Sequence, residues 1–329
     1  MDSSNLERIG VLTSGGDAPG MNACIRAVTR GCVYHDITPY GIREGYRGLI
    51  ENNIFEMEAG SVRHIIHQGG TILKSARCEE FKTSKGREKA CKHIKDKGLD
   101  ALVIIGGDGS FKGALALNED YDIPVIGIPG TIDNDIAGTD FTIGFDSATN
   151  TVVEAVDKIR DTATSHNRLF FIEVMGRDAG DIALNSGIAA GSEEILIPEK
   201  DMGIERLFES LKRSSRRNKT SRIVIVAEGD DSGNVYDLAE EVTNRFDGRY
   251  ETKVTILGHV QRGGRPTCAD RVLASRLGVN AIEALQRGRK NIMLGIKDNK
   301  ISYTALEQAT KQHATIDKEL LHVADVVSI

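Results

Sequence analysis

Two carboxylates stand two residues apart near the middle of the sequence, in a segment with the composition of an active-site loop. The segment Pro-Gly-Thr-Ile-Asp-Asn-Asp occupies residues 129–135 and follows the apolar run 125–128. Such a run, closed by Pro and Gly, predicts a buried parallel strand, and ligands of open α/β sheets bind at the carboxyl ends of these strands. Asp133 and Asp135 can then divide two tasks, one taking a proton and the other orienting its partner or a metal. Taken alone, the segment fits a turn equally well, because Asp and Asn also bond their own backbone.

A glycine-rich loop just upstream favours phosphoryl-transfer chemistry over a plain turn. Residues 102–105 predict a buried strand, and Gly-Gly-Asp-Gly-Ser at 106–110 leads into a helical stretch at 112–117. Glycines let backbone N–H groups approach phosphate oxygens, and the positive end of the following helix adds to the attraction. Because Asp108 is itself negative, we expect it to hold a Mg²⁺ ion that bridges phosphates.

Other predicted strands also end in loops that carry polar or charged residues. Residues 9–13 predict a first strand, followed by Ser-Gly-Gly-Asp-Ala-Pro-Gly at 14–20 and a helix from about residue 22 to 34. Arginines behind glycine turns are suited to grip anionic groups. For isolated residues the structural alternatives stay open: packing is favoured for the ring of Tyr46, a turn cap fits Glu228 equally well, and a core role fits His259. The remaining loops carry Arg77, Met175-Gly176-Arg177, Glu228, and His259 three residues before Arg262.

Composition places the chain among ordinary globular proteins. Its 329 residues allow one large or two medium α/β units, and 40% hydrophobic with 27% charged residues is typical of such proteins. With 42 Lys and Arg against 48 Asp and Glu, the net charge of -6 argues against a broad nucleic-acid-binding face. Five scattered cysteines without a C-x-x-C pair fit reduced thiols and argue against structural zinc. No apolar run approaches the roughly 18 residues of a membrane span, so we expect a soluble, cytoplasmic enzyme.

The order of the elements predicts a doubly wound α/β sheet, because strand, glycine-containing loop and helix recur along the chain. Asp146 or Ser147 is expected to cap a long helix, and a domain change is expected near residue 145. Further strands are predicted near 40–42 and at 169–174, 195–197, 223–227 and 254–257. The basic residues between 212 and 222 are expected on a solvated helix face, and the tail from Asp270 is expected to hold amphipathic helices.

Together these motifs resemble the ATP-dependent 6-phosphofructokinase family over about residues 8–285. The matching segments are 13–22 (Thr-Ser-Gly-Gly-Asp-Ala-Pro-Gly-Met-Asn), 106–110, 129–135, 175–177 and 258–264. The resemblance implies glycolytic phosphoryl transfer from ATP, with Mg²⁺, to the 1-hydroxyl of fructose 6-phosphate, giving fructose 1,6-bisphosphate and ADP. It implies a cytoplasmic homotetramer, with sites shared across subunits and no nucleic-acid or membrane partner.

The resemblance also implies two Rossmann-like three-layer α/β/α lobes with mainly parallel sheets and the active site between them. Residues 1–144 plus about 262–310 would form the ATP- and magnesium-binding lobe. Residues 145–261 plus about 311–329 would form the fructose 6-phosphate-binding lobe.

Individual roles follow from the resemblance, motif by motif. Asp133 would be the base for the sugar hydroxyl, Arg177 would stabilise the transition state, and Thr131 and Asp135 would support the transferring phosphate and its metal. The nucleotide site would comprise Gly16, Tyr46, Arg77, Cys78, Asp108, Gly109, Ser110 and Gly113, with Asp108 on the metal. The substrate site would comprise Thr131, Asp133, Arg168, Met175, Gly176, Arg177, Glu228, Lys253, His259 and Arg262, with Arg168 lent across an interface. An effector site for ADP or phosphoenolpyruvate would comprise Arg26, Arg30, Arg160, Glu193 and Lys219.

Two departures, at Lys253 and Ala59, limit this resemblance, and two glycines bear on the identity of the phosphoryl donor. Lys253 stands where relatives usually carry an interface arginine, so weaker sugar-phosphate binding is expected, and Ala59 replaces a customary effector-site arginine. Gly109 and Gly130 favour ATP, since pyrophosphate-using relatives tend to carry Asp and Lys there.

Three alternative functions stay open. The first is a pyrophosphate-dependent phosphofructokinase. The second is a non-catalytic nucleotide-binding regulatory subunit, which would be expected to have lost Asp133 or Arg177. The third is a NAD or lipid kinase, whose relatives share the Gly-Gly-Asp-Gly loop but would not need the Met175-Gly176-Arg177 motif.

Overall fold

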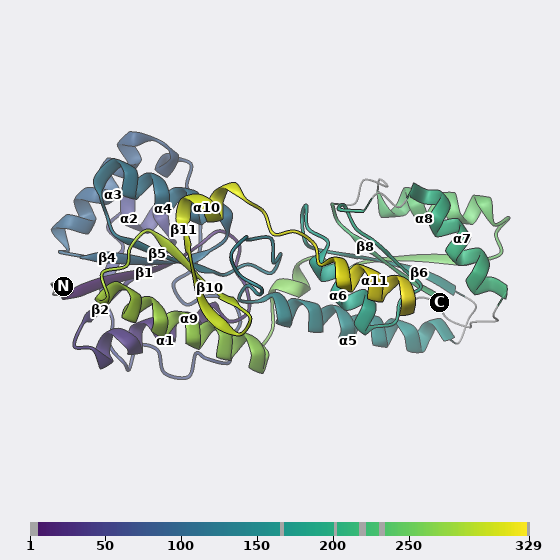
Figure 1. Ribbon diagram of the computed structural model, residues 1–329, viewed down its shortest axis with the longest axis horizontal. Coiled ribbons are helices and arrows are strands. Elements are labelled where there is room, and N and C mark those ends of the chain that lie inside the picture. The colour runs from purple at the N-terminus through teal and green to yellow at the C-terminus, as the bar shows by residue number, and fades with distance from the viewer. Residues whose placement is uncertain (1–5, 165–167, 201–202, 217–221, 230–233, 328–329) are drawn as a thin grey trace. The chain divides into compact units, whose positions relative to one another are not determined.

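The computed structural model describes residues 6–164, 168–200, 203–216, 222–229 and 234–327, and the chain forms two compact units (Figure 1). The first unit comprises Met1–Ile132, Ile136–Ser147 and Arg262–Ala314. The second comprises Asp133–Asp135, Ala148–Gln261 and Thr315–Ile329. The stretch Asp133–Asp135, expected with the first unit, groups with the second, which also contains Arg177, the ion-pair partner of Asp133. The predicted α/β class with mainly parallel sheets is confirmed.

The first unit is built on a seven-stranded sheet with the order β11-β10-β5-β4-β1-β2-β3. Its middle strands run parallel, and the strands at both edges, β3 and β11, pair antiparallel with their neighbours. β4 and β5 are buried along their whole length, as expected for parallel strands covered on both faces. The bounds are β1 (Arg8–Ser14), β2 (Thr38–Ile42), β3 (Ile54–Glu56), β4 (Ala101–Gly106), β5 (Val125–Pro129), β10 (Ile292–Lys297) and β11 (Lys300–Ala305).

Helices cover both faces of this sheet (Figure 1). On one face α1 (Met21–Tyr34) packs along α9 (Cys268–Gln286). The approach is close at Gly278, where an added Cβ would lie 2.6 Å from Cβ of Ala27 and 3.0 Å from the carbonyl oxygen of Cys24. The other face carries α2 (Tyr46–Ile50), the 3₁₀ helix η1 (Glu80–Lys82), α3 (Ser84–Asp96), α4 (Asp108–Tyr121) and α10 (Leu306–Lys311).

The second unit has a four-stranded parallel sheet with the order β7-β8-β6-β9. The core on one side of this sheet joins aromatic and aliphatic side chains, among them Phe171, Phe208 and Tyr250. Its strands are β6 (Arg168–Val174), β7 (Glu194–Leu196), β8 (Arg222–Ala227) and β9 (Glu251–Ile256). Its helices are α5 (Phe145–Thr164), α6 (Asp181–Ala189), α7 (Gly203–Arg216), α8 (Val235–Arg245), the 3₁₀ helix η2 (Gly258–Arg262) and α11 (Lys318–Val327). The first residues of α5 and the last residue of η2 belong to the first unit.

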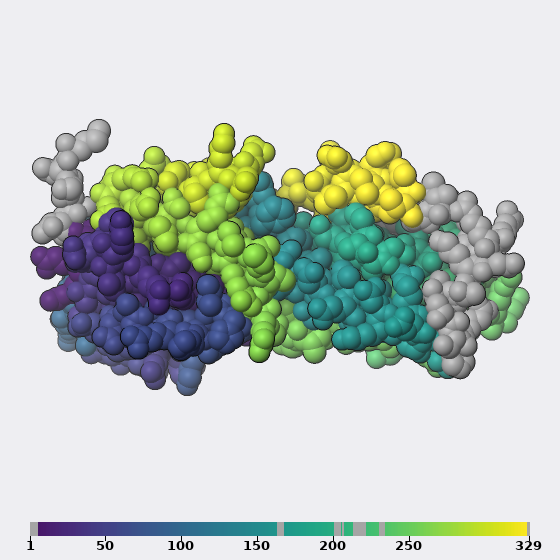
Figure 2. All heavy atoms as spheres, turned by 90° about the horizontal axis from the view of Figure 1, so that it is seen from below, coloured from purple at the N-terminus to yellow at the C-terminus, as the bar shows by residue number. Residues whose placement is uncertain are grey.

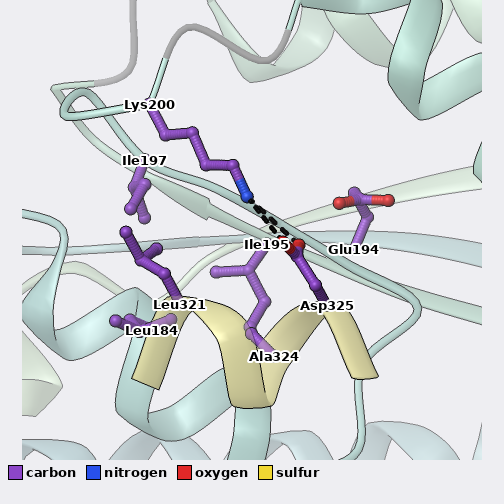
Figure 3. Close-up of a pocket in the computed structure, with 8 residues that line it drawn as sticks. All are labelled: Leu184, Glu194, Ile195, Ile197, Lys200, Leu321, Ala324 and Asp325. Atoms are coloured by element: carbon purple, nitrogen blue, oxygen red, sulfur yellow. Dashed lines mark hydrogen bonds and ion pairs between the residues drawn. The ribbon is translucent and has the colours of Figure 1, made fainter. Parts of the chain in front are cut away.

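The C-terminal helix α11 lies on the surface of the second unit, where it has no fully buried residue (Figure 2). It packs against α6 and faces the end of β7 (Figure 3). Lys200 joins it through an ion pair whose Nζ lies 3.1 Å from Oδ1 of Asp325. Side chains of α11, among them Leu321 and Ala324, thus line a pocket together with Ile195 of β7.

The tail from Asp270 contains helices, as expected, but it also contains two strands that the sequence analysis did not predict. After α9 the chain forms the hairpin of β10 and β11, whose two-residue turn is Asp298-Asn299. Both turn residues have positive φ, 49° and 59°, as a type I′ turn requires. The Asp-Asn pair between two apolar runs was the sequence signal that could have predicted this hairpin. Within the described part of the chain, no helix is long and apolar enough to cross a membrane.

We predict that Gly278→Ala destabilises the protein by about 1–3 kcal/mol, the cost of overpacking a close helix contact. Helix propensity alone predicts the opposite sign, a gain of about 1 kcal/mol. Denaturant unfolding of the two proteins measures the difference. The neighbouring Val279→Ala, at a side chain 39% exposed, is the matched control and should change stability by less than about 0.5 kcal/mol. A higher unfolding midpoint for Gly278→Ala would contradict the proposed steric limit.

Candidate active site

The glycine loop after β4 is shorter than expected, because α4 already begins at Asp108 with Gly107 as its N-cap residue. The first backbone N–H groups of a helix lack the partners that later turns supply, so they attract anions. No atom of the described residues lies within 4 Å of the position that a Cβ of Gly109 would take. The structure therefore leaves open space beside the first turn of α4, where a phosphate can approach.

The loops after β1 and β4 touch each other at Gly106. A Cβ there would lie 2.5 Å from the carbonyl oxygen of Ser14 and 2.5 Å from Oγ of Ser110. Gly15, with φ of 86°, turns the chain away from the strand beside this contact. The absence of a side chain at residue 106 therefore permits two predicted phosphate loops to form one surface.

Arg262 lies against the β1 loop within the first unit. Its Nη1 donates to the carbonyl oxygen of Asp17 at 3.2 Å. A Cβ on Gly16 would lie only 2.5 Å from the same Nη1. The structure thus brings Gly16 and Arg262 together, although the sequence suggested separate partners for them, the nucleotide and the sugar phosphate.

The loop that precedes Arg77 is fastened by a residue whose role the sequence analysis missed. Asn22, buried in the first turn of α1, donates to the carbonyl oxygens of Gln68 and Gly69 at 3.2 and 3.0 Å. Its Oδ1 accepts from the N–H of Ile72 at 2.8 Å. A buried asparagine in an otherwise apolar helix turn is the signal that marks such an anchor.

Tyr46 is a packed residue in this structure. Its ring stacks on Phe81 with 4.0 Å between centroids, and its hydroxyl donates to the carbonyl oxygen of Ser110 at 2.5 Å. A Cβ on Gly113 would lie 2.7 Å from this ring, and burial raises the pKa of the Tyr46 phenol. The ring of Tyr46 is therefore packed, as the sequence analysis favoured. Its place beside a purine stays a prediction, and so does that of the half-buried Cys78.

Asp108 has one carboxylate oxygen suited to a metal ion. Its Oδ2 accepts from Nζ of Lys112 at 2.6 Å, whereas its buried Oδ1 has no hydrogen-bond partner among the described residues. An unsatisfied buried oxygen is costly, and Mg²⁺ prefers such hard oxygen ligands. No group of three or more His, Cys, Asp or Glu that could hold a metal occurs in the described ranges. The donor chemistry of the Asp108 carboxylate therefore suits a magnesium ion.

The two residues expected to do the chemistry meet in the second unit. Nε of Arg177 lies 3.7 Å from Oδ2 of Asp133, and the side chains are 61% and 4% exposed. Asn134 and Arg177 both adopt left-handed backbone conformations, with φ of 57° and 54°. Such conformations are uncommon outside glycine and often mark functional sites, so the structure holds both residues against a local backbone preference.

The turn that presents Arg177 is anchored through its backbone. Oε1 of Glu228 accepts from the N–H of Arg177 at 2.9 Å and from that of Gly176 at 3.4 Å. Gly229 permits this approach, because a Cβ there would lie 1.9 Å from the carbonyl oxygen of Arg177. Glu228 is thus a backbone anchor in the structure, and its bond to a sugar hydroxyl stays a prediction.

Gln261 is a second residue whose role the sequence analysis missed. It is fully buried, accepts from the N–H of Met175 at 3.2 Å and donates to the carbonyl oxygen of Gly258 at 3.0 Å. The end of β6 is therefore tied to η2, which also carries the exposed His259. The sequence hint of this anchor was the position of Gln261 between His259 and Arg262, the two residues predicted to bind the substrate.

The two cations expected to bind the sugar phosphate converge on one carboxylate. Nε of Arg168 lies 3.0 Å from Oε2 of Glu251, and Nζ of Lys253 lies 2.8 Å from Oε1. Their hydrogen bonds and charges lower the pKa of Glu251 to about 2. Adjacent strands position them, because Arg168 on β6 pairs with Glu251 on β9. The structure brings Arg168 and Lys253 to one place, as a shared phosphate site requires.

The predicted effector residues fall in both units. Arg26 and Arg30 lie on α1, where burial, and then the charge of Arg30, lowers the pKa of Arg26. In the second unit Arg160 donates to the carbonyl oxygens of Ala190 and Gly191. There the buried Glu193 accepts from the N–H of Ile223 at 2.5 Å. Lys219 lies outside the described residues, and the effector role of the set stays a prediction.

Comparison with known proteins gives one consistent result. The family model for phosphofructokinase matches residues 8–285. The chain is 53% identical over 324 residues to an ATP-dependent 6-phosphofructokinase of Halalkalibacterium halodurans, covering 98% of this chain and 100% of that protein. It is 54% identical over 325 residues to the corresponding protein of Bacillus licheniformis, with the same coverage. A solved phosphofructokinase structure from Saccharomyces cerevisiae matches with a TM-score of 0.88 and 35% identity, covering 98% of this chain and 46% of that chain.

We predict that Lys253→Ala raises the pKa of Glu251 from about 2 toward its ordinary value of 4.5, because one of its two cationic partners is removed. Since the folded-state pKa lies below the ordinary value, Glu251 contributes stability above about pH 4.5 that is lost as the pH falls toward 2. Carboxyl carbon NMR titration measures the pKa, with Glu251→Gln to assign the signal. Lys290→Ala, a lysine of the first unit, should leave the titration unchanged. If Glu251 of the unmodified protein titrates near pH 4.5, the proposed pairing of Glu251 with both Arg168 and Lys253 is contradicted.

Proposed function

The chain belongs to the phosphofructokinase family, and we propose that it phosphorylates the 1-hydroxyl of fructose 6-phosphate with ATP, using Asp133 as the general base. The products are fructose 1,6-bisphosphate and ADP, as in glycolysis. The observation that carries the assignment of the base is the approach of the buried Asp133 carboxylate to the guanidinium of Arg177 at 3.7 Å.

The proposed step is an in-line displacement at the γ-phosphorus. The sugar 1-oxygen forms the new O–P bond while its proton passes to Asp133, and the bond from the γ-phosphorus to the bridging oxygen breaks as ADP leaves. Burial of Asp133 places its charge in a medium of low dielectric, where a positioned base and cation act strongly. Arg177 offsets the negative charge that spreads over the transferring group, and Thr131 and Asp135 support that group.

The nucleotide would lie at the loops of the first unit. Backbone N–H groups at the start of α4, with Gly109 and Ser110, would hold phosphate oxygens beside Gly16, and Arg77 would add charge. Asp108 would hold Mg²⁺ through its Oδ1. The ion supplies charge neutralisation to the β- and γ-phosphates when it is bound. Tyr46, Cys78 and Gly113 would shape the purine side of this site.

The sugar phosphate would be held by residues of β6 and β9 and of the loops that follow β6, β8 and β9. Arg168 and Lys253, neutralised here by Glu251, would exchange that carboxylate for the 6-phosphate. We infer that they do so for a neighbouring subunit in a homotetramer. Met175, Gly176, Glu228, His259 and Arg262 would complete the contacts, and ADP or phosphoenolpyruvate would act through Arg26, Arg30, Arg160, Glu193 and Lys219.

The space at two glycines supports ATP as the donor. Gly109 faces open space, as a site for an α-phosphate requires. At Gly130 a Cβ would lie 2.9 Å from Cγ2 of Ile105 and 3.2 Å from Cε of Met21, so a lysine there would need local repacking. A regulatory subunit without catalysis is not favoured, because Asp133 and Arg177 are both present and paired.

We predict that Asp133→Ser lowers kcat by about 10²–10⁴-fold, the usual contribution of a positioned general base. A coupled assay with fructose 6-phosphate and Mg²⁺, run with ATP and separately with pyrophosphate, measures both donor and base. Asp237→Asn, at an exposed carboxylate of α8, is the control and should keep the parent activity. Turnover with pyrophosphate alone would overturn the donor assignment, and an active Asp133→Ser would overturn the base.

We predict that Gly109→Asp raises KM for ATP about tenfold or more, which corresponds to about 1.4 kcal/mol. The side chain fits without collision, so its effect comes from a negative charge beside the nucleotide phosphates. Gly109→Ala adds the same Cβ without the charge and should change KM much less. Steady-state kinetics at saturating fructose 6-phosphate separates the two, and equal effects of both variants would contradict the electrostatic explanation.

A further inference from the structure

Asp181 is a carboxylate that the proposed reaction does not use. It lies in the first turn of α6, partly buried, and its side chain is hydrogen-bonded to the side chain of Asn134. Burial and, to a lesser extent, the charges of Glu199, Asp135 and Asp317 raise the pKa of Asp181 to about 6, although the hydrogen bond to Asn134 opposes this rise. A carboxylate kept among other acids, and joined to the loop of the proposed base, needs a functional explanation.

Asn134 connects this carboxylate to the proposed base. It stands between Asp133 and Asp135, is buried, and has a φ of 57°. The left-handed region is disfavoured for residues other than glycine, although asparagine tolerates it when its side chain bonds locally. The bond to Asp181 gives the Asn134 side chain one fixed partner, so the backbone that presents Asp133 is fixed as well.

The start of α6 is itself well positioned for this role. The N–H of Gly180, the residue before Asp181, donates to Oε1 of Glu199 at 2.8 Å. Nδ2 of Asn185, one turn later, donates to the main-chain carbonyl oxygen of Asp181 at 2.9 Å. Asp181 also follows Arg177 by four residues, so a single stretch carries both the cation that faces Asp133 and the anchor of its loop.

We propose that Asp181 is a positioning residue that holds Asn134 in its left-handed conformation and so directs Asp133 toward Arg177 and the reacting hydroxyl. The inference rests on the proposed role of Asp133 as base and extends it. Asp181 acts through Asn134 and makes no contact with substrate. Because displacement of a reacting group by about 1 Å can cost about 10²-fold in rate, losing this anchor affects kcat rather than binding.

The test compares Asp181→Ala, Asp181→Asn, Asn134→Ala and the double variant Asn134→Ala/Asp181→Ala in the full chain. Asp181→Ala and Asn134→Ala should each lower kcat about 10- to 100-fold, while KM for ATP and for fructose 6-phosphate changes less than about threefold. The double variant should lose no more than either single one, because both remove the same interaction. Asp181→Asn keeps an acceptor for the Asn134 amide and should retain kcat within about threefold.

The matched control is Asp237→Ala, which removes an exposed carboxylate from the first turn of α8 in the same unit. It loses a similar favourable charge at a helix N-terminus but has no bond to the base loop, so its kcat should equal that of the parent. Circular dichroism and unfolding midpoints establish that each variant is folded. If Asp181→Ala does not fold, Asn134→Ala and Asp181→Asn carry the same test.

Each outcome decides one claim. Loss of kcat in both single variants without further loss in the double variant supports the inference. A kcat within twofold of the parent for folded Asp181→Ala or for Asn134→Ala overturns it, as do additive losses or a change confined to KM. An active Asp133→Ser would overturn the proposed base itself, whereas an inactive Asp133→Ser beside a fully active Asp181→Ala removes only the positioning role.

Discussion

The structure depends on holding the buried carboxylate of Asp133 in a fixed direction beside a cation. A carboxylate that is almost fully enclosed is costly unless charge and hydrogen bonds compensate it. Arg177 supplies the charge, and its own turn is fixed by Glu228 through two backbone N–H groups. Around these residues the chain accepts two left-handed backbone conformations that ordinary loops avoid.

Close backbone approach is the corresponding constraint in the first unit. Gly106 lets the loops after β1 and β4 meet, and the open position beside Gly109 leaves the helix N-terminus accessible. Anion binding by backbone N–H groups needs this geometry, since a side chain at either place would fill the space. Asn22 adds a third loop to the same region through bonds to residues 68–72. Phosphate-binding capacity therefore arises from main-chain packing as much as from charged side chains.

The acidic net charge of the chain is consistent with anionic substrates because cations are placed locally. Arg168 and Lys253 share Glu251, so in the free protein their charges are balanced rather than left to repel each other. The proposed sugar phosphate would compete with Glu251 for the same pair of cations. Asp108 shows a different arrangement, with Lys112 on one oxygen and no hydrogen-bond partner for the other among the described residues.

Local sequence determined the class of the fold, the buried strands before the main loops, and which residues are proposed to carry the chemistry, because apolar runs and glycine turns are short-range signals. It failed at the tail, where the hairpin β10–β11 is stabilised by a parallel neighbour, β5, more than 160 residues earlier. Tertiary structure alone decided that Tyr46 packs on Phe81, that Glu228 and Gln261 anchor backbone, and that Asp181 reaches Asn134. These roles depend on which distant residue lies within hydrogen-bond distance, and no local pattern specifies that.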